Sequence, residues 1–420
     1  MNTIENHVHL YKSEYPEKSL MNYIDNIEAK SGLDNIIVEH RSSNPRRDFL
    51  FVNKKQGKHI PCKASETINM CRSLYNVIIQ GLYNKYGRRE LNEKNILVVA
   101  FAETATAIGN IIADNIRQCR YVLQTTRETI DNSKQIITFE EEHSHATTQY
   151  LRTYDDDRAI DLGGFDYVLF VDDEISTGNT IINFINAIEK VKSGLSYGVA
   201  SICNWQNAED RAKFDERDID VFALITGNLK DANIKMFSDE NKPKILDEAQ
   251  LLDNNAGICD YTVNCVDMDG VFETERLGHR PNRDLTKAFR VIDSIVNSSD
   301  NRVRIIGTEE FMYIPIKIGE YIENKYGCTV LCQATTRSSI DVLESGTLSS
   351  RKMQNELVSK HYLPSVYDNN RKTYLYNIAE TVDRVIIVSD KKLSRTAMQG
   401  IVNGFKNSGY AKEVNIVIME

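Results

Sequence analysis

The sequence predicts an α/β protein of two tandem units, each with a mostly parallel central sheet, the second unit diverged from the first. Short apolar runs alternate with amphipathic stretches along most of the chain, which is typical of βα units that build a parallel sheet. In addition, four features of the first half return in the same order in the second half, which indicates an internal repeat.

The first unit is expected over residues 1–230, including an N-terminal extension. Apolar residues at a spacing of three to four predict an amphipathic helix over 66–86. The polar stretch 128–160 is predicted as a long loop or hairpin, and loops of that length are usually functional. The remaining predicted elements are a strand over 95–101, a helix over 106–117, a strand over 121–127, a strand over 166–173, a helix over 179–192, and strands over 198–205 and 221–227.

Residues 231–258 are mixed and polar, and we interpret them as a linker to a second unit over 259–420. The order and spacing of its features repeat those of the first unit, with a helix and a last strand behind them. The paired segments are LGHRP (277–281) with QGKHIP (56–61), RVRIIGTEE (302–310) with NILVVAFAET (95–104), VLCQATTRSSI (330–340) with YVLQTTRETI (121–130), and DRVIIVSD (383–390) with DYVLFVDD (166–173).

The bulk composition excludes several classes of function. The chain has 420 residues and a formal net charge of −9, which argues against a nucleic-acid partner, because such binders need a basic face. No apolar stretch approaches the length of a membrane span, and the start resembles no signal peptide, so we expect a cytoplasmic protein without a membrane partner. The eight cysteines form no C-x-x-C pair and are expected to be reduced and mostly buried.

The segment Val168–Thr180 carries the most specific chemical pattern. Its apolar residues predict a buried strand that ends at Asp172 and Asp173, where open α/β sheets bind their ligands. The next turn places hydroxyl groups and Gly178 ahead of a helix, so that backbone N–H groups can surround an anion. Carboxylates beside a phosphate repel it unless they engage sugar hydroxyls or a hydrated Mg²⁺. A pentose phosphate meets these requirements.

This segment resembles the signature of type I phosphoribosyltransferases that binds 5-phosphoribosyl-1-pyrophosphate (PRPP): an apolar strand and two acids, then T-G-x-T. The resemblance implies that Asp172 and Asp173 hold the ribose hydroxyls, directly or through Mg²⁺, as catalytic residues and metal ligands. It also implies that the turn behind them holds the 5-phosphate. The expected PRPP-binding residues here are Asp172, Asp173, Glu174, Ser176, Thr177, Gly178, Asn179 and Thr180.

A second candidate loop follows the predicted strand 95–101, at the place where that family keeps its diphosphate loop. Its small residues let backbone amides approach a diphosphate. Arg127, at the end of the next strand, is expected to add a cation, with an ordinary surface arginine as the alternative. The residues expected to bind PRPP in this loop are Glu103, Thr104, Ala105 and Thr106.

Three further features are candidates for the site. His143 and His145 lie where such enzymes have a loop that closes over the reacting centre, and either is a candidate general acid or base; a solvated loop is the alternative. The segment Arg41–Pro61 is rich in Lys and Arg and either contacts PRPP or the base, or forms a solvated hairpin. Trp205 lines the base pocket or lies in the core.

The combined pattern is similar to one particular family. Residues 45–205, with GKHIP, FAETATAIG, QTTRE, EEHSHAT and VDDEISTGNT, resemble the phosphoribosyltransferase of bacterial tellurium-resistance and stress gene clusters. Residues 260–420, with GTEEFMYIPIKIG, ATTRSSI and YDNNRKTYLYNI, resemble the TRSP domain fused behind it, although Ser339 stands where that name implies proline. Such clusters are associated with a nucleoside-like metabolite.

The second unit lacks the phosphoribose pattern of the first. Ser389 replaces one of the two acids before Asp390, and the T-G-x-T turn is absent. We therefore expect no similar PRPP site there. Either a different anionic ligand binds to the second unit, or the unit completes or covers the active site of the first.

These observations predict a Mg²⁺-dependent transferase that moves phosphoribose between PRPP and a nucleobase-like acceptor, with diphosphate as co-product. A homodimer is one option for its assembly. The main alternative is a regulator that senses PRPP or a nucleotide without catalysis. A PRPP synthetase is a weaker alternative, suggested by the tandem arrangement. A haloacid-dehalogenase-type phosphatase is suggested by Asp267 and Asp269, but the other motifs of that family are missing.

Overall fold

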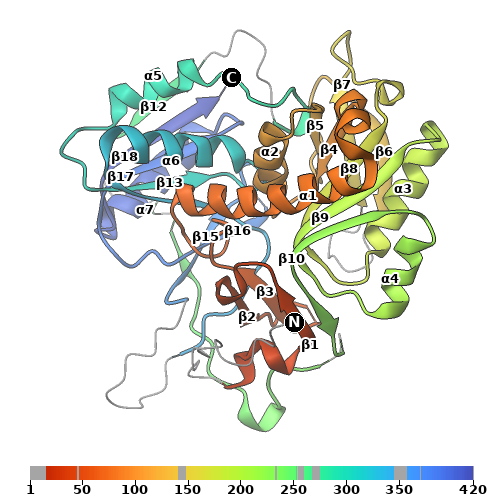
Figure 1. Cartoon of the computed structure of the whole chain (residues 1–420). Coiled ribbons are helices and arrows are strands. Elements are labelled where there is room, and N and C mark those ends of the chain that lie inside the picture. The colour runs from red at the N-terminus through yellow and green to blue at the C-terminus, as the bar shows by residue number, and fades with distance from the viewer. Residues whose placement is uncertain are drawn as a thin grey trace.

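The computed structural model describes residues 16–44, 47–140, 148–231, 234–251, 253, 260–266, 275–344, 357–368 and 370–419. Its architecture is α/β, with one parallel-rich sheet in each half of the chain (Figure 1). Helices α1 (Ala64–Glu93) and α2 (Thr106–Asn115) pack on the first sheet, and α6 (Tyr313–Tyr326) packs on the second. The three helices also contact one another where the halves meet, so a single apolar core extends from one half into the other.

The first sheet has six strands, of which all but the outermost, β1, run parallel. Helices α3 (Asn179–Val191) and α4 (Ala208–Asp215) belong to the same half; α4 was not predicted from the sequence. The order of the strands is β1 (Ile24–Ala29), β10 (Asp220–Leu229), β9 (Ser196–Asn204), β8 (Tyr167–Ile175), β4 (Ile96–Ala100) and β5 (Cys119–Gln124).

Strand β8 lies inside the sheet between β9 and β4, and its apolar residues are buried on both faces. Alternation along the strand directs Val168 and Phe170 to the core under α3, whereas Leu169 and Val171 face the core under α1 and α2. The polar stretch between β5 and β8 contains an antiparallel hairpin, β6 (Ser133–Glu140) and β7 (Thr148–Tyr154). Of the two predictions for this stretch, the hairpin is therefore confirmed.

The second sheet has five parallel strands. Helices α5 (Thr286–Ile295), α6 and α7 (Arg395–Asn407) accompany it. A separate small sheet is formed by β11 (Ala249–Gln250), β15 (Lys360–Pro364) and β16 (Lys372–Tyr376), so part of the segment predicted as a linker pairs with the second half. The order of the parallel strands is β12 (Thr262–Val266), β18 (Ala411–Met419), β17 (Val382–Ser389), β13 (Arg302–Gly307) and β14 (Thr329–Ala334).

The two sheets share the order of their corresponding strands. When β5, β4, β8 and β9 are matched with β14, β13, β17 and β18, the neighbours are the same in both sheets. A hairpin follows β5 in the first half and β14 in the second. The fifth parallel strand differs, because β10 is the last strand of its half and β12 is the first of its own.

Each half also covers an edge strand of the other. Val122 on β5 and His279 exchange two backbone hydrogen bonds, of 2.8 and 2.9 Å. Cys332 on β14 and Cys62 exchange two more, of 2.8 and 3.1 Å. His279 lies in the segment LGHRP (277–281), and Cys62 directly follows the segment QGKHIP (56–61). These are two of the segments paired in the predicted repeat. An uncovered edge strand is open to aggregation. These reciprocal contacts cover one edge strand in each sheet, and they also hold the two halves together.

Two other expectations concern bulk properties. In the part of the chain that the structure describes, no helix is long and apolar enough to cross a membrane. The described cysteines are free thiols, most of them buried, but Cys265 on β12 is exposed, unlike the general expectation. The N-terminal extension adds a hairpin, β2 (Ile36–His40) with β3 (Phe49–Asn53), which lies below the first sheet in Figure 1.

Candidate functional site

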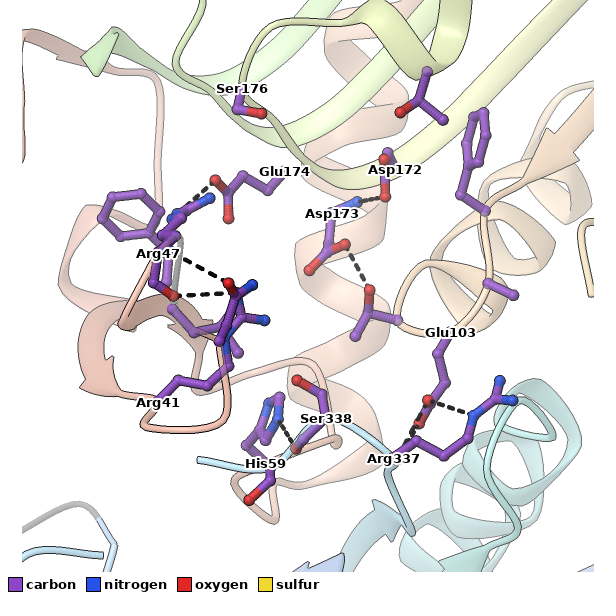
Figure 2. A pocket seen from close by; sticks show the side chains of 18 of the residues that line it. Arg41, Arg47, His59, Glu103, Asp172, Asp173, Glu174, Ser176, Arg337 and Ser338 are labelled. Atoms are coloured by element: carbon purple, nitrogen blue, oxygen red, sulfur yellow. Dashed lines mark hydrogen bonds and ion pairs between the residues drawn. The ribbon is translucent and has the colours of Figure 1, made fainter. Parts of the chain in front are cut away.

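A cavity of about 980 Å³ lies at the carboxyl ends of β4 and β8. Its volume falls in the range of small-molecule sites. The cavity is lined by the strand ends of the first sheet, by the segment 41–59 around the β2–β3 hairpin, by Gln149 on β7 and by residues of the second half (Figure 2). This is the edge of the sheet at which the sequence predicts a ligand.

The register of the sheet explains why two separate segments meet here. Ala100 on β4 lies opposite Val171 on β8, and the N–H of Phe101 donates to the carbonyl of Val171 at 2.9 Å. The loop after β4 therefore runs beside Asp172 and Asp173. The hydroxyl of Thr104 donates to Oδ1 of Asp173 at 2.6 Å, which joins the two predicted loops directly.

The turn after β8 depends on Gly178. This residue has φ +80°, a conformation that L side chains rarely adopt, and a Cβ there would lie 2.4 Å from the ring of Phe214. Gln206 supports the turn by donating to the carbonyl of Thr177 at 3.2 Å. Helix α3 begins at Asn179, so the first N–H groups of the helix lie at the cavity, where an anion is stabilised.

Asp172 and Asp173 both line the cavity and are half-buried. The backbone N–H of Asp173 donates to Oδ1 of Asp172 at 2.9 Å, which orients the Asp172 carboxylate against the backbone of the turn. Two carboxylates beside a phosphate-sized turn are a donor set that suits Mg²⁺, because this ion commonly takes one or two carboxylates and completes its shell with water and substrate phosphates. The described residues contain no larger cluster of potential metal ligands.

Glu103 is buried at the cavity wall between two cations. Its Oε1 lies 2.5 Å from Nζ of Lys58, and its Oε2 accepts from Nε of Arg337 at 3.2 Å. Burial alone would raise the pKa of Glu103, but Lys58 and Arg337 together hold it well below its usual value. The carboxylate is therefore charged and engaged in the protein, and it shapes the loop that was predicted to bind diphosphate.

Other predicted residues of this loop lie elsewhere. Ala105 and Thr106 are completely buried and do not line the cavity, which differs from the prediction. The hydroxyl of Thr106 donates to the carbonyl of Glu310, and the N–H of Ala105 donates to the carbonyl of Phe101. The packing of α2 against the second half uses these groups, so only the first part of the loop reaches the cavity.

The remaining predictions divide into three groups. Thr104, Arg127, Glu174, Ser176, Thr177, Gly178 and Thr180 line the cavity with the two aspartates, and Asn179 begins α3 directly behind them. Trp205 is completely buried, with its ring 5.4 Å from that of Phe51, so of the two positions expected for it the core is confirmed. His143, His145, Asp267 and Asp269 lie outside the described residues.

The second half contributes side chains that sequence reasoning did not assign to the site. Arg371, Lys372 and Tyr374, on or next to β16, line the cavity, as do Arg337 and Ser338 after β14. A signal existed, because the hairpin of the second half follows its T-T-R segment just as the hairpin of the first half does. Thr336 pairs with Tyr374 as Thr126 pairs with Tyr150.

The corresponding position of the second half is filled by its own side chains. Asp390, at the end of β17, forms an ion pair with Nη1 of Arg276 and a hydrogen bond with the hydroxyl of Tyr367. Nε of Arg276 donates to Glu310 at 2.7 Å. Arg276 and Asp390 are almost completely buried there, which agrees with the expectation that this half has no PRPP site like the first.

Paired carboxylates, a glycine turn and a small-residue loop at adjoining strand ends are the arrangement that the sequence resemblance predicts for a phosphoribosyl transferase. The chain matches the phosphoribosyl transferase model PRTase_2 over residues 38–228. It matches the TRSP domain, described as lying C-terminal to that transferase, over residues 273–405. Residues 38–228 therefore belong to the phosphoribosyl transferase family, and residues 273–405 belong to the TRSP domain that lies C-terminal to it.

Comparison with individual proteins gives shorter or more distant matches. Hypoxanthine/guanine phosphoribosyltransferase of Methanothermus fervidus is 32% identical over 76 residues, which are 18% of this chain and 39% of that protein. Adenine phosphoribosyl transferase of Trypanosoma brucei is 12% identical with a TM-score of 0.32, covering 51% of this chain and 83% of that chain. Orotate phosphoribosyltransferase of Aeropyrum pernix is 14% identical with a TM-score of 0.28, covering 46% and 88%.

Proposed function

We propose that this protein transfers the phosphoribosyl group of PRPP to a nucleobase-like acceptor, or catalyses the reverse reaction, with diphosphate as the second product. The observation that carries the proposal is the meeting of Asp172, Asp173, the Gly178 turn and Thr104 in a single cavity. The cavity joins an anion-binding turn to a pair of carboxylates, and PRPP presents both a phosphate and a diol.

Each part of PRPP has a proposed partner in the cavity. The N–H groups and hydroxyls from Ser176 to Thr180 bind the 5-phosphate, supported by the N-terminus of α3. Asp172 and Asp173 accept hydrogen bonds from the ribose hydroxyls. The diphosphate lies at the loop Phe101–Thr104, where Arg127 supplies positive charge.

The chemistry then follows from positioning. A ring nitrogen of the acceptor forms a bond to C1 of the ribose while the bond from C1 to the diphosphate oxygen breaks, and the diphosphate leaves with the electron pair. The cations of the cavity stabilise the charge that develops on the diphosphate, and the walls hold the acceptor in line with C1. His143 and His145 remain the candidates for proton transfer, on the sequence alone.

Mg²⁺ fits the proposed site because Asp172 and Asp173 offer oxygen ligands beside the place assigned to the diphosphate. When bound, the ion would neutralise charge on the diphosphate. The two carboxylates are the residues that would hold it, either directly or through water. The hydrogen bond from Thr104 to Asp173 orients one of them for this role.

We further propose that the second half, over 259–420, is a diverged copy of the first unit, over 1–230, that lost PRPP binding and now closes the cavity. The matching strand order and the reciprocal edge pairing support a duplication. The side chains of Arg337, Arg371 and Lys372 in the cavity wall support the closing role. A stress-linked pathway for a nucleoside-like metabolite is proposed from the family resemblance alone.

The test is the release of diphosphate from magnesium–PRPP in the presence of a panel of heterocyclic bases, with each product identified by mass. The Asp172→Asn and Asp173→Asn double variant should lose PRPP turnover, with each lost charged hydrogen bond costing about ten- to a hundredfold. Asp34→Asn, which changes an exposed aspartate remote from the cavity, is the matched control. Full activity of the double variant would reject the proposal.

The second candidate function, a regulator that senses PRPP without catalysis, gives a different result in the same assay. It requires tight binding of PRPP by calorimetry with no diphosphate release for any base. The deep burial of Glu103 and Arg337, whose network links the cavity to the second half, is the observation that favours such signalling. The double variant loses PRPP binding under either function, so the release of diphosphate decides between them.

A further inference from the structure

One end of the cavity combines two arginines with an apolar wall. Arg41 directly follows β2 and Arg47 precedes β3, and both line the cavity. The guanidinium of Arg47 lies 4.6 Å from the ring centroid of Phe49 and 4.8 Å from that of Phe51, and its Nη2 donates to Oε1 of Glu174 at 2.9 Å. The apolar side chains of this wall are Leu50, Phe51, Ile175 and Leu229.

These two arginines have few ion-pair and hydrogen-bond partners among the described residues. Among the residues that the structure describes, the only hydrogen bond of the Arg41 guanidinium is a long one, 3.5 Å, from Nη2 to the carbonyl of Arg47. No described carboxylate forms an ion pair with it, and Glu174 is the only such partner of Arg47. The Nε atoms of both arginines are buried without a hydrogen-bond partner.

The burial and the mutual repulsion of the two arginines also favour a bound anion. Burial, followed by the neighbouring charge of Arg47, lowers the pKa of Arg41, and Glu174 only partly opposes this. Burial raises the pKa of Glu174, Arg47 opposes this, and the neighbouring charge of Asp173 raises it further. Two half-buried cations that share one carboxylate are costly for the fold unless a further negative charge joins them. A bound anionic group would supply that charge.

The arrangement proposed for PRPP implies that the anionic group at the arginine end belongs to the other substrate. The turn Ser176–Thr180 takes the 5-phosphate and the loop Phe101–Thr104 takes the diphosphate, so neither phosphate is assigned to the arginine end. An apolar wall beside charged groups suits a flat ring with one ionised substituent. The arginine pair is also at the carboxyl end of β8, next to Glu174, and so within the same cavity as the sugar.

We infer that the acceptor is a heterocycle that carries an anionic group, a carboxylate in the simplest case, and that Arg41 and Arg47 bind this group. The inference rests on the proposed function, because it presumes that the rest of the cavity holds PRPP. Planar guanidinium groups suit a carboxylate, since they can donate two parallel hydrogen bonds. Glu174 holds Arg47 in place and can accept a ring N–H of the same acceptor.

The experiment compares matched pairs of probes that differ only in charge. Nicotinate is compared with nicotinamide, orotate with orotamide, and imidazole-4-carboxylate with its carboxamide. Binding to the full-length protein is measured by titration calorimetry in the presence of Mg²⁺, ribose 5-phosphate and diphosphate, which fill the other subsites without reacting. Product formation with PRPP is then measured by mass for the same probes.

At least one carboxylate should bind ten- to a hundredfold more tightly than its carboxamide. Arg41→Gln and Arg47→Gln should abolish that preference, while the affinity for PRPP changes less than threefold. Arg41→Lys and Arg47→Lys, which keep the charge, should retain part of it, and they keep the test valid if a glutamine variant folds poorly. Arg89→Gln, at an exposed position of α1, should behave as the wild type.

Three outcomes would overturn the inference: equal binding within every pair, no binding of any carboxylate, or a loss of PRPP affinity in Arg41→Gln as large as the loss for the carboxylate. The last result would assign the arginines to a phosphate of PRPP. Carboxylate preference in the calorimetry without any PRPP-dependent product would refute the proposed transfer reaction and leave the anion site standing. The two failures are therefore distinguishable.

Discussion

Nε of Arg337, in the second half, donates to Oε2 of Glu103, in the first half, at 3.2 Å. The backbone N–H of Arg337 donates to the same carboxylate at 3.2 and 3.3 Å. The guanidinium also lies 2.9 Å from Glu128, 3.5 Å from Glu309 and 2.8 Å from Glu310. These carboxylates outweigh the effect of burial and raise the pKa of Arg337 above its usual value. One side chain of the second half thus pairs with carboxylates of both halves at the junction.

Replacing Arg337 by methionine keeps most of its volume and removes this shared cation. Breaking a buried ion pair costs about 3–5 kcal/mol, so the free energy of unfolding at pH 7 should fall by that amount in a urea titration. The matched control is Arg302→Met, since Arg302 forms an exposed pair with Glu380 and should lose about 1 kcal/mol or less. Equal losses for the two variants would contradict the role assigned to Arg337.

Arg371 tests whether the second half takes part in substrate binding. It lines the cavity and also contacts Glu128 at 2.7 Å and Glu309 at 3.4 Å. If its charge helps to hold the diphosphate, Arg371→Gln should raise KM for PRPP about tenfold and leave KM for the acceptor nearly unchanged. Steady-state kinetics with each substrate varied in turn measures this.

Lys412→Gln serves as the control for Arg371, because Lys412 pairs with Asp383 on the surface, away from the cavity. Neither KM should change in this variant. If Arg371→Gln were kinetically identical to it, the second half would form a wall of the cavity without contributing charge to catalysis.

Gly178→Ala separates backbone strain from damage to the phosphate turn. Alanine at φ +80° costs about 1–2 kcal/mol, and the added Cβ would meet the ring of Phe214. Gly194 has φ +81° with open space around it, so Gly194→Ala should cause the strain alone. Both variants should lower the melting temperature, but only Gly178→Ala should weaken PRPP binding in calorimetry. Equal PRPP affinity in the two variants would show that the turn does not bind the 5-phosphate.

Glu275 should make the protein less stable as the pH rises from acidic to neutral. The side chain is completely buried, and burial raises its pKa from 4.5 to about 7. Between these two pKa values the folded state keeps the proton and the unfolded chain loses it. The stability that protonated Glu275 contributes is therefore complete below about pH 4.5 and is lost as the pH rises toward 7. Over this range the free energy of unfolding should fall by at most about 1.4 kcal/mol per pH unit.

Glu275→Gln removes this titration and keeps the hydrogen-bond acceptor that Ile314 N–H contacts at 2.9 Å. Urea unfolding between pH 5 and 8 should therefore show the variant gaining stability relative to the wild type as the pH rises. Glu380→Gln, which alters an exposed carboxylate, should show no such trend. Parallel curves for Glu275→Gln and the wild type would mean that Glu275 titrates normally.

The agreement between sequence and structure is closest where the information is local. Apolar residues with acids behind them form β8, and the predicted turn with Gly178 follows it, because strand, turn and helix start are set by neighbouring residues. The strand and helix that flank the second candidate loop also form within a few residues of their predicted ends. Candidates chosen on this basis, such as Thr104 and Ser176, do reach the cavity.

The prediction is weakest where distant segments meet. Thr106 looked like a loop donor, but its hydroxyl is taken by Glu310, which is 204 positions away in the chain. The sequence left Trp205 either at the base pocket or in the core, and only the packing of Phe51 from the N-terminal hairpin against it decided for the core. Neither contact leaves a periodic or spacing signal in the sequence, because each depends on how separately folded elements pack.

The sequence by itself determined the alternation of strands and helices, the paired aspartates behind a buried strand and the glycine turn, since these follow from hydrophobic periodicity and from backbone conformation. Only the tertiary structure decided that Cys62 pairs with β14, that His279 pairs with β5, and that Arg337 meets Glu103. These contacts join the halves, and their energies come from desolvation and charge balance in the packed molecule, which no local pattern encodes.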